Sequence, residues 1–182
     1  MKALLASLLL AVSTATAFSQ VSDKVASTPA LNNDWRPGFI NITELTGGVG
    51  VGLIDVPYSK SFFGITTVNG YQFTRNVKAG IGVGVMAFNG GTLLPVYLDT
   101  RYSFNAQEYV PFISAAGGVA LSLKDFKGAS RIFINPSVGL KWVAANNIGI
   151  SFSTGFIALS GGGLRDSFVN FRLGVEFKGK EY

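Results

Sequence analysis

The side chains that could carry chemistry in this chain of 182 residues are acids, bases and hydroxyls, because it contains no His and no Cys. Without imidazole and thiol groups, Ser-His-Asp hydrolysis, thiolate catalysis and most zinc sites are excluded. Ser residues are plentiful, but no His is available to activate one as a nucleophile. We therefore expect no enzyme activity, no cofactor and no metal site.

Six charged residues have a spacing that could bring them together: Glu44, Asp99, Arg101, Lys141, Arg172 and Glu176. Each lies on the polar positions of a segment in which apolar and polar residues alternate. Buried charges need partners, and three acids with three bases supply them. We interpret the set as a structural cluster that fills an interior, with Glu44 meeting Arg172 directly. A proton or ion pathway is the alternative.

The elements that would position these charges are eight strand-like segments. They are residues 39–53, 61–74, 79–88, 93–104, 109–123, 131–143, 148–158 and 167–177. The stretches between them contain the Gly, Asn, Asp and Pro residues that turns require. Capped segments with helical periodicity are absent. The sequence therefore predicts an all-β chain.

Alternation with a period of two is clearest in the third, fourth, sixth, seventh and eighth segments. Residues 79–88, for example, place Ile and Val on one parity and mostly Gly on the other. The first segment is less regular, because Ile40 and Ile42 are out of phase with Val49 and Val51, which predicts a bulge.

The two parities favour an inverted barrel. One parity is large and apolar, whereas the other consists mostly of Gly, Ser, Asn and charged residues, which suit a narrow lumen better than an oily core. The sequence thus predicts a closed, antiparallel, eight-stranded, up-and-down transmembrane β-barrel. A soluble sandwich or lipocalin-like barrel is the alternative.

The N-terminus has the pattern of an export signal. Lys2 precedes an apolar run from Ala3 to Val12, and Ala15-Thr16-Ala17 fits a cleavage site. The run is shorter than the about 20 residues of a membrane-spanning helix. We expect a signal peptide over residues 1–17, or 1–19 if cleavage follows Ser19. A flexible periplasmic lead-in over 18–34 and the barrel over 35–182 would follow.

The order of the connections predicts an orientation with both termini in the periplasm, because the turns on that side, RNVK, NAQE and AANN, are then all short. Aromatic residues near strand ends should then form two girdles at the membrane surfaces. The periplasmic girdle would contain Tyr102, Phe104, Tyr109, Trp142 and Phe177, and the outer girdle would contain Tyr58, Phe63, Phe156 and Phe168.

Two shorter patterns have simple interpretations. Lys124, Lys127 and Arg131 lie in a predicted outer loop and could contact anionic lipopolysaccharide, with ordinary loop solvation as the alternative. Asn41-Ile42-Thr43 matches a glycosylation sequon, which we interpret as coincidental in a bacterial strand. The basic residues are otherwise dispersed despite a net charge of +5, so we expect no nucleic-acid partner.

Three strings, KAGIGVGV, TLLPVYLDTRYSF and FVNFRLGVEF, resemble those of small outer-membrane β-barrels. These are the OmpA/OmpX-like barrels of the porin family in Gram-negative bacteria, and the resemblance covers about residues 35–182. It implies that an aromatic residue of the last strand, Phe177 or the terminal Tyr182, is read by the barrel assembly machinery.

These observations together predict a non-enzymatic outer-membrane barrel with a packed polar lumen. We expect a monomer with a structural or surface-binding role, whose partners are outer-membrane lipid and lipopolysaccharide. A narrow porin-like channel and a lipid-modifying enzyme that works without His are the alternatives.

Overall fold

The computed structural model describes residues 35–51, 60–123, 130–145, 147–161 and 164–179. The predicted signal peptide, the lead-in over 18–34 and Tyr58 lie outside these residues. Within the described part of the chain, no helix is long and apolar enough to cross a membrane.

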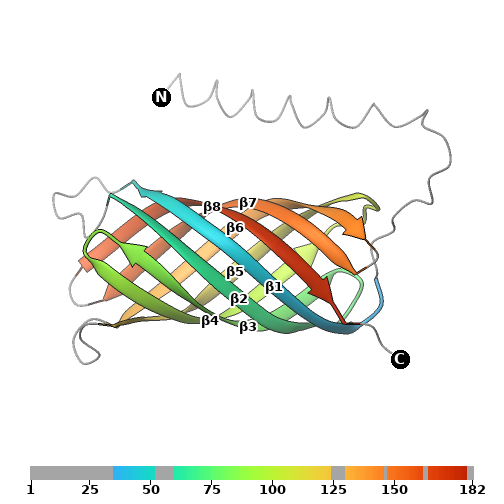
Figure 1. The fold of residues 1–182 in the computed structure, drawn as a ribbon, viewed down its shortest axis with the longest axis horizontal. Helices are drawn as coiled ribbons and strands as arrows, with labels where there is room; N and C mark the ends of the chain where they lie inside the picture. Colours follow the sequence, from blue (N-terminus) through green and yellow to red (C-terminus); the bar gives the residue numbers. More distant parts are fainter. Residues whose placement is uncertain (1–34, 52–59, 124–129, 146, 162–163, 180–182) are drawn as a thin grey trace, which may run out of the picture. The chain divides into compact units, whose positions relative to one another are not determined.

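Eight antiparallel strands form a closed barrel, as the alternation predicts (Figure 1). They are β1 (Gly38–Gly50), β2 (Ser61–Gln72), β3 (Val77–Phe88), β4 (Gly91–Ser103), β5 (Tyr109–Ser122), β6 (Arg131–Ala145), β7 (Ile148–Gly161) and β8 (Leu164–Lys178). Each strand pairs with the next, and β1 pairs with β8. The up-and-down topology is therefore confirmed.

The two ends of the barrel differ in their connections. β1 begins and β8 ends at the same end, at the right in Figure 1, which we call the terminal end. The connections over 73–76, 104–108 and 146–147 also lie there. The opposite, distal end carries the two longest connections, residues 51–60 and 123–130.

The side chains alternate between the two faces along the strands. On β4, Tyr97 is 6% exposed, Leu98 65% and Asp99 2%. Because strand side chains point alternately to opposite faces, this pattern separates an apolar exterior from a filled interior. Val138, at the middle of β6, is 56% exposed and belongs to the exterior.

The bulge predicted in the first segment is absent, so that prediction is wrong. β1 keeps one register with β2 from Gly38 to Val49, and with β8 from Ile40 to Gly50. Ile40 and Ile42 are out of phase because they point inward, where both are buried. β1 is continuous, but in this stretch apolar side chains (Ile40 and Ile42) face inward and polar side chains (Asn41 and Thr43) face outward, the reverse of the polarity that the alternation predicts.

An inward-facing glycine lets two neighbouring strands approach closely. A Cβ atom at Gly118 would lie 2.2 Å from the Val96 carbonyl oxygen and 2.5 Å from the Cα of Tyr97. The adjacent Gly117 has no atom closer than 3.6 Å to such a Cβ.

These distances predict different effects for two neighbouring substitutions. Gly118→Ala should lower the free energy of unfolding by about 1–3 kcal/mol, because the backbone of β4 must move away. Gly117→Ala, the matched control, should change it by less than about 1 kcal/mol. Urea titrations of the refolded protein in lipid vesicles would measure both. Equal effects would contradict this account of the Gly118 packing.

Candidate functional site

The largest polar assembly of the barrel is a charge network in the terminal half of its interior. Glu44 on β1 is 1% exposed and lies between two guanidinium groups. Its Oε1 is 3.0 Å from Nη2 of Arg101, and its Oε2 accepts a hydrogen bond of 3.2 Å from Nη1 of Arg172. The predicted contact between Glu44 and Arg172 is therefore present.

Arg101 and Arg172 make further contacts that hold their guanidinium groups in place. Nε of Arg101 donates a hydrogen bond of 2.7 Å to Asp99 Oδ1, and its guanidinium lies 5.6 Å from the ring centre of Phe112. Arg172 donates to Ser114 Oγ at 3.1 Å and also to Ser137. The network thus joins β1, β4, β5, β6 and β8.

A second group of charges lies nearer the terminal end. Glu176 on β8 accepts hydrogen bonds from Lys78 and, at 3.0 Å, from Lys141. All three residues are buried. The sequence analysis missed Lys78 because it began this strand at residue 79, whereas β3 begins at Val77. Lys78 lies on the same inward parity as Gly80, so the alternation could have predicted that its side chain faces the interior.

All six charges predicted to line the interior are thus buried there, and Lys78 contacts one of them. The three carboxylates of Glu44, Asp99 and Glu176 each contact at least one cation. Such an arrangement compensates the charge of each carboxylate inside a narrow barrel, since a buried carboxylate without a cation is strongly unfavourable. In the described part of the chain, no group of three or more acidic residues could hold a metal ion.

Apolar side chains fill most of the distal half of the interior, whereas the prediction was a packed polar lumen. Phe62, Phe88 and Phe168 pack there with ring centres 5.0–5.5 Å apart. Leu93 and Ile157 belong to the same buried cluster. We call these five residues the apolar plug. Phe168 is 0% exposed, so its predicted place in an outer aromatic girdle is wrong.

Between the apolar plug and the charge network lies a layer of incompletely paired polar groups. In the described structure, Thr46 Oγ1, Asn135 Oδ1, Arg172 Nε and both side-chain polar atoms of Asn170 have no hydrogen-bond partner. Thr46, Asn135 and Arg172 line a cavity of about 10 Å³, enough for roughly one water molecule.

The residues predicted to contact lipopolysaccharide are placed differently from one another. Arg131 is buried and forms an ion pair with Asp166 inside the distal end of the barrel. It therefore lies in the interior and not in the outer loop to which it was assigned. Lys124 and Lys127 lie outside the described residues.

The aromatic residues predicted at the terminal end do face outward. Tyr102, Phe104, Tyr109, Trp142 and Phe177 are 42–55% exposed. Phe63 and Phe156, predicted nearer the distal end, are also exposed.

Comparison with solved structures shows which known folds this barrel resembles. Neisserial surface protein A aligns with a TM-score of 0.61 and 13% identity, over 79% of this chain and 99% of that one. The N-terminal barrel domain of Pseudomonas aeruginosa OprF gives a TM-score of 0.48 and 16% identity, over 78% and 100% of the two chains. Ail of Yersinia pestis gives 0.48 and 13%, over 78% and 99%.

The chain has the fold of a small outer-membrane β-barrel. This likeness is one of architecture, because the identities are low. No protein-family model matches the sequence, and neither does any curated protein. The role of the barrel must therefore be argued from its own two faces.

Because Glu44 contacts both Arg101 and Arg172, its loss alone should destabilise the protein more than the joint replacement of Glu44 and Arg172. Glu44→Leu should lower the free energy of unfolding by about 3–5 kcal/mol, because it leaves Arg172 buried without a carboxylate. Adding Arg172→Met should recover part of this loss, with a coupling energy of about 0.5–3 kcal/mol in a double-mutant cycle. Urea titrations in lipid vesicles would measure the cycle.

Thr46→Val provides a control at a buried position on the same strand. The Thr46 hydroxyl has no hydrogen-bond partner, so its loss should be nearly neutral. A cycle without coupling would show that the pair of Glu44 and Arg172 does not contribute to stability as proposed.

Proposed function

We propose that this protein is a non-enzymatic, integral barrel of a bacterial outer membrane with a structural or surface-binding role. The observation that carries this proposal is the combination of an apolar exterior with an interior closed by side chains.

The exterior supports a lipid environment. Large apolar side chains such as Leu98 on β4 and Ile132 and Val138 on β6 are 56–66% exposed. A soluble protein rarely exposes a continuous apolar surface of this kind. The outward aromatic residues at the terminal end match the girdles found where membrane barrels meet the headgroups.

The interior supports a closed barrel and not an open pore. Eight strands leave a lumen just wide enough for side chains to fill it. Here the apolar plug fills the distal half, and the charge network fills the terminal half. A solute would have to displace both layers to pass.

A narrow channel is the second candidate, and one observation favours it. The unpartnered polar atoms of Thr46, Asn135 and Asn170 form a layer that water could occupy. Hydration of this layer alone would not connect the two ends, because the apolar plug lies on its distal side.

The orientation and partners also belong to the proposal. We place both termini on the periplasmic side, because outer-membrane barrels have short periplasmic turns and longer outer loops, and the two longest connections lie at the distal end. Export by a signal over residues 1–17 or 1–19, recognition of Phe177 or Tyr182 by the assembly machinery, and contact of Lys124 and Lys127 with lipopolysaccharide are consistent with this placement.

The proposed location predicts a simple biochemical behaviour. The mature protein should fractionate with outer membranes, and its mobility on a denaturing gel should change after heating, because a closed barrel resists unfolding by detergent. The Glu44→Leu variant should lose this heat-dependent shift at a lower temperature than the natural protein. Recovery of the protein as a soluble periplasmic species would contradict the proposal.

The closed interior predicts the absence of steady conductance in planar lipid bilayers. Two filled layers should block ions, so insertions should produce no stable current steps, whereas a sixteen-stranded porin in the same bilayers should produce them. Rare, small openings are compatible with rearrangement of the charge network. Ohmic steps of constant size in most insertions would favour the channel instead.

A further inference from the structure

Four polar side chains lie together on the outer surface of β1 and β2. Most of the barrel exterior around them is apolar. They are Asn41, Thr43, Thr67 and Asn69, which we call the polar patch. This is the stretch in which the polarity of the faces is exchanged, since the neighbouring Ile40, Ile42 and Val68 are buried inside.

Apolar residues surround the polar patch on every side. Phe39 and Tyr71 lie toward the terminal end, with ring centres 5.1 Å apart, and Leu45 and Ile65 lie toward the distal end. On the flanking strands, Asn41 is opposite Phe177 and Asn69 is opposite Ile81. The patch therefore adjoins the terminal aromatic girdle at Phe177 and extends from there into the apolar belt.

The hydrogen bonds within the patch leave one amide group unused. Nδ2 of Asn41 donates to Asn69 Oδ1 at 2.8 Å and to Thr67 Oγ1 at 3.1 Å. The Thr43 hydroxyl is 3.3 Å from Asn41 Oδ1. The side-chain nitrogen of Asn69 donates no hydrogen bond to any described residue, and Asn69 is exposed. It can donate, and its Oδ1 can accept a second bond.

Two other outward hydroxyl groups are satisfied within the barrel. Thr100 donates to the Ala115 carbonyl oxygen at 3.1 Å, and Thr154 donates to the Asn170 carbonyl oxygen at 3.2 Å. Asn69 differs because its Nδ2 donates to no described residue. An amide without partners in a hydrocarbon environment is unfavourable by several kcal/mol, so the patch is expected to have an external partner.

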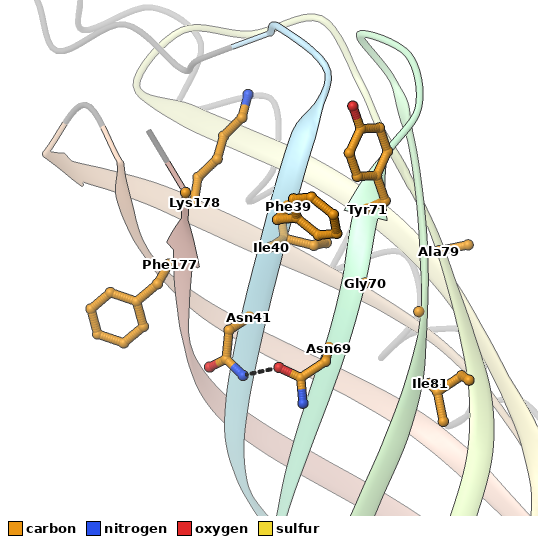
Figure 2. Close-up of a pocket in the computed structure, with 12 residues that line it drawn as sticks. Phe39, Ile40, Asn41, Asn69, Gly70, Tyr71, Ala79, Ile81, Phe177 and Lys178 are labelled. Atoms are coloured by element: carbon orange, nitrogen blue, oxygen red, sulfur yellow. Dashed lines mark hydrogen bonds between the residues drawn. The ribbon is translucent and has the colours of Figure 1, made fainter. Parts of the chain in front are cut away.

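A groove beside the patch can receive a side chain. It has a volume of about 580 Å³, and its lining includes Tyr71, Ala79 and Ile81 beside Asn41 and Asn69 (Figure 2). The small side chain of Ala79 leaves space beside the larger side chains of Tyr71 and Ile81. Phe39, at the edge of the same groove, is 76% exposed and projects outward.

We infer that the polar patch and this groove form a self-association surface, whose partner is a second copy of this chain. An amide is self-complementary, so across a two-fold axis each Asn69 can donate to the other's Oδ1. The same axis would bring the Phe39 side chain of each copy to the groove at Ala79 of the other, since an isologous interface makes each contact twice. Lipid tails offer no hydrogen-bond acceptor, and small and polar residues promote association within membranes.

This inference replaces the expected monomer and rests on the proposed membrane location. The absence of Cys allows a direct test, because any introduced Cys is unique. Copies carrying Phe39→Cys, co-expressed with copies carrying Ala79→Cys on β3, should give disulfide-linked dimers when native membranes are treated with a mild oxidant, because the two-fold axis brings Phe39 of one copy to Ala79 of the other. Ala115→Cys in place of Ala79→Cys is the matched control, because Ala115 also faces outward, on β5 at the other side of the barrel. It should give none.

A second substitution tests the role of the amide. Adding Asn69→Leu to both copies should reduce cross-linking, and fluorescence energy transfer between labelled copies in vesicles should show a dimer Kd raised about tenfold. Adding Thr100→Val instead should leave the Kd unchanged, because that hydroxyl is satisfied within its own barrel.

The possible outcomes separate this inference from the proposed location. Loss of the heat-dependent gel shift in the natural protein would contradict the membrane location itself. Given a normal shift, equal cross-linking at Ala79 and Ala115, no cross-linking at Ala79, or a Kd unaffected by Asn69→Leu would each overturn the self-association surface. A monomer that loses a co-purifying phospholipid on Asn69→Leu would assign the surface to lipid and also overturn it.

Discussion

The pairing of β1 with β8 is the constraint on which the remainder of this structure depends. It runs from Ile40 opposite Lys178 to Gly50 opposite Phe168. An open sheet would leave two edges of unpaired backbone groups, which a hydrocarbon environment does not tolerate. Closure satisfies these groups, and it also encloses a narrow space of fixed width. Every inward side chain must then fit this space and find its partners within it.

The barrel fills its interior by different means in its two halves. Aromatic and aliphatic packing fills the distal half, and ion pairs fill the terminal half. The ion pairs join residues far apart in the chain, with Lys78 and Glu176 separated by 98 positions and Glu44 and Arg172 by 128. Because a register slip of one residue would turn such a charge toward the apolar exterior, the network opposes incorrect strand pairing.

The exterior shows that the two faces need not keep one polarity along a whole strand. Near the terminal end of β1 and β2, Ile40, Ile42 and Val68 fill the interior, while Asn41 and Asn69 face outward. The exchange leaves the backbone register unchanged. An irregular hydrophobic pattern in a barrel strand can therefore report a surface with its own partner, and not only a distortion of the strand.

The sequence by itself determined the number of strands, their order and the faces of most of them, because a period of two is a local property of the chain. It also placed Glu44, Asp99, Arg101, Lys141, Arg172 and Glu176 on the inner face. Apart from the contact between Glu44 and Arg172, only the tertiary structure decided which charge meets which, and it alone showed the inclusion of Lys78 and the burial of Arg131 and Phe168. These depend on the stagger between strands and on small extensions of strand ends. Neither is encoded in the alternation of a single segment.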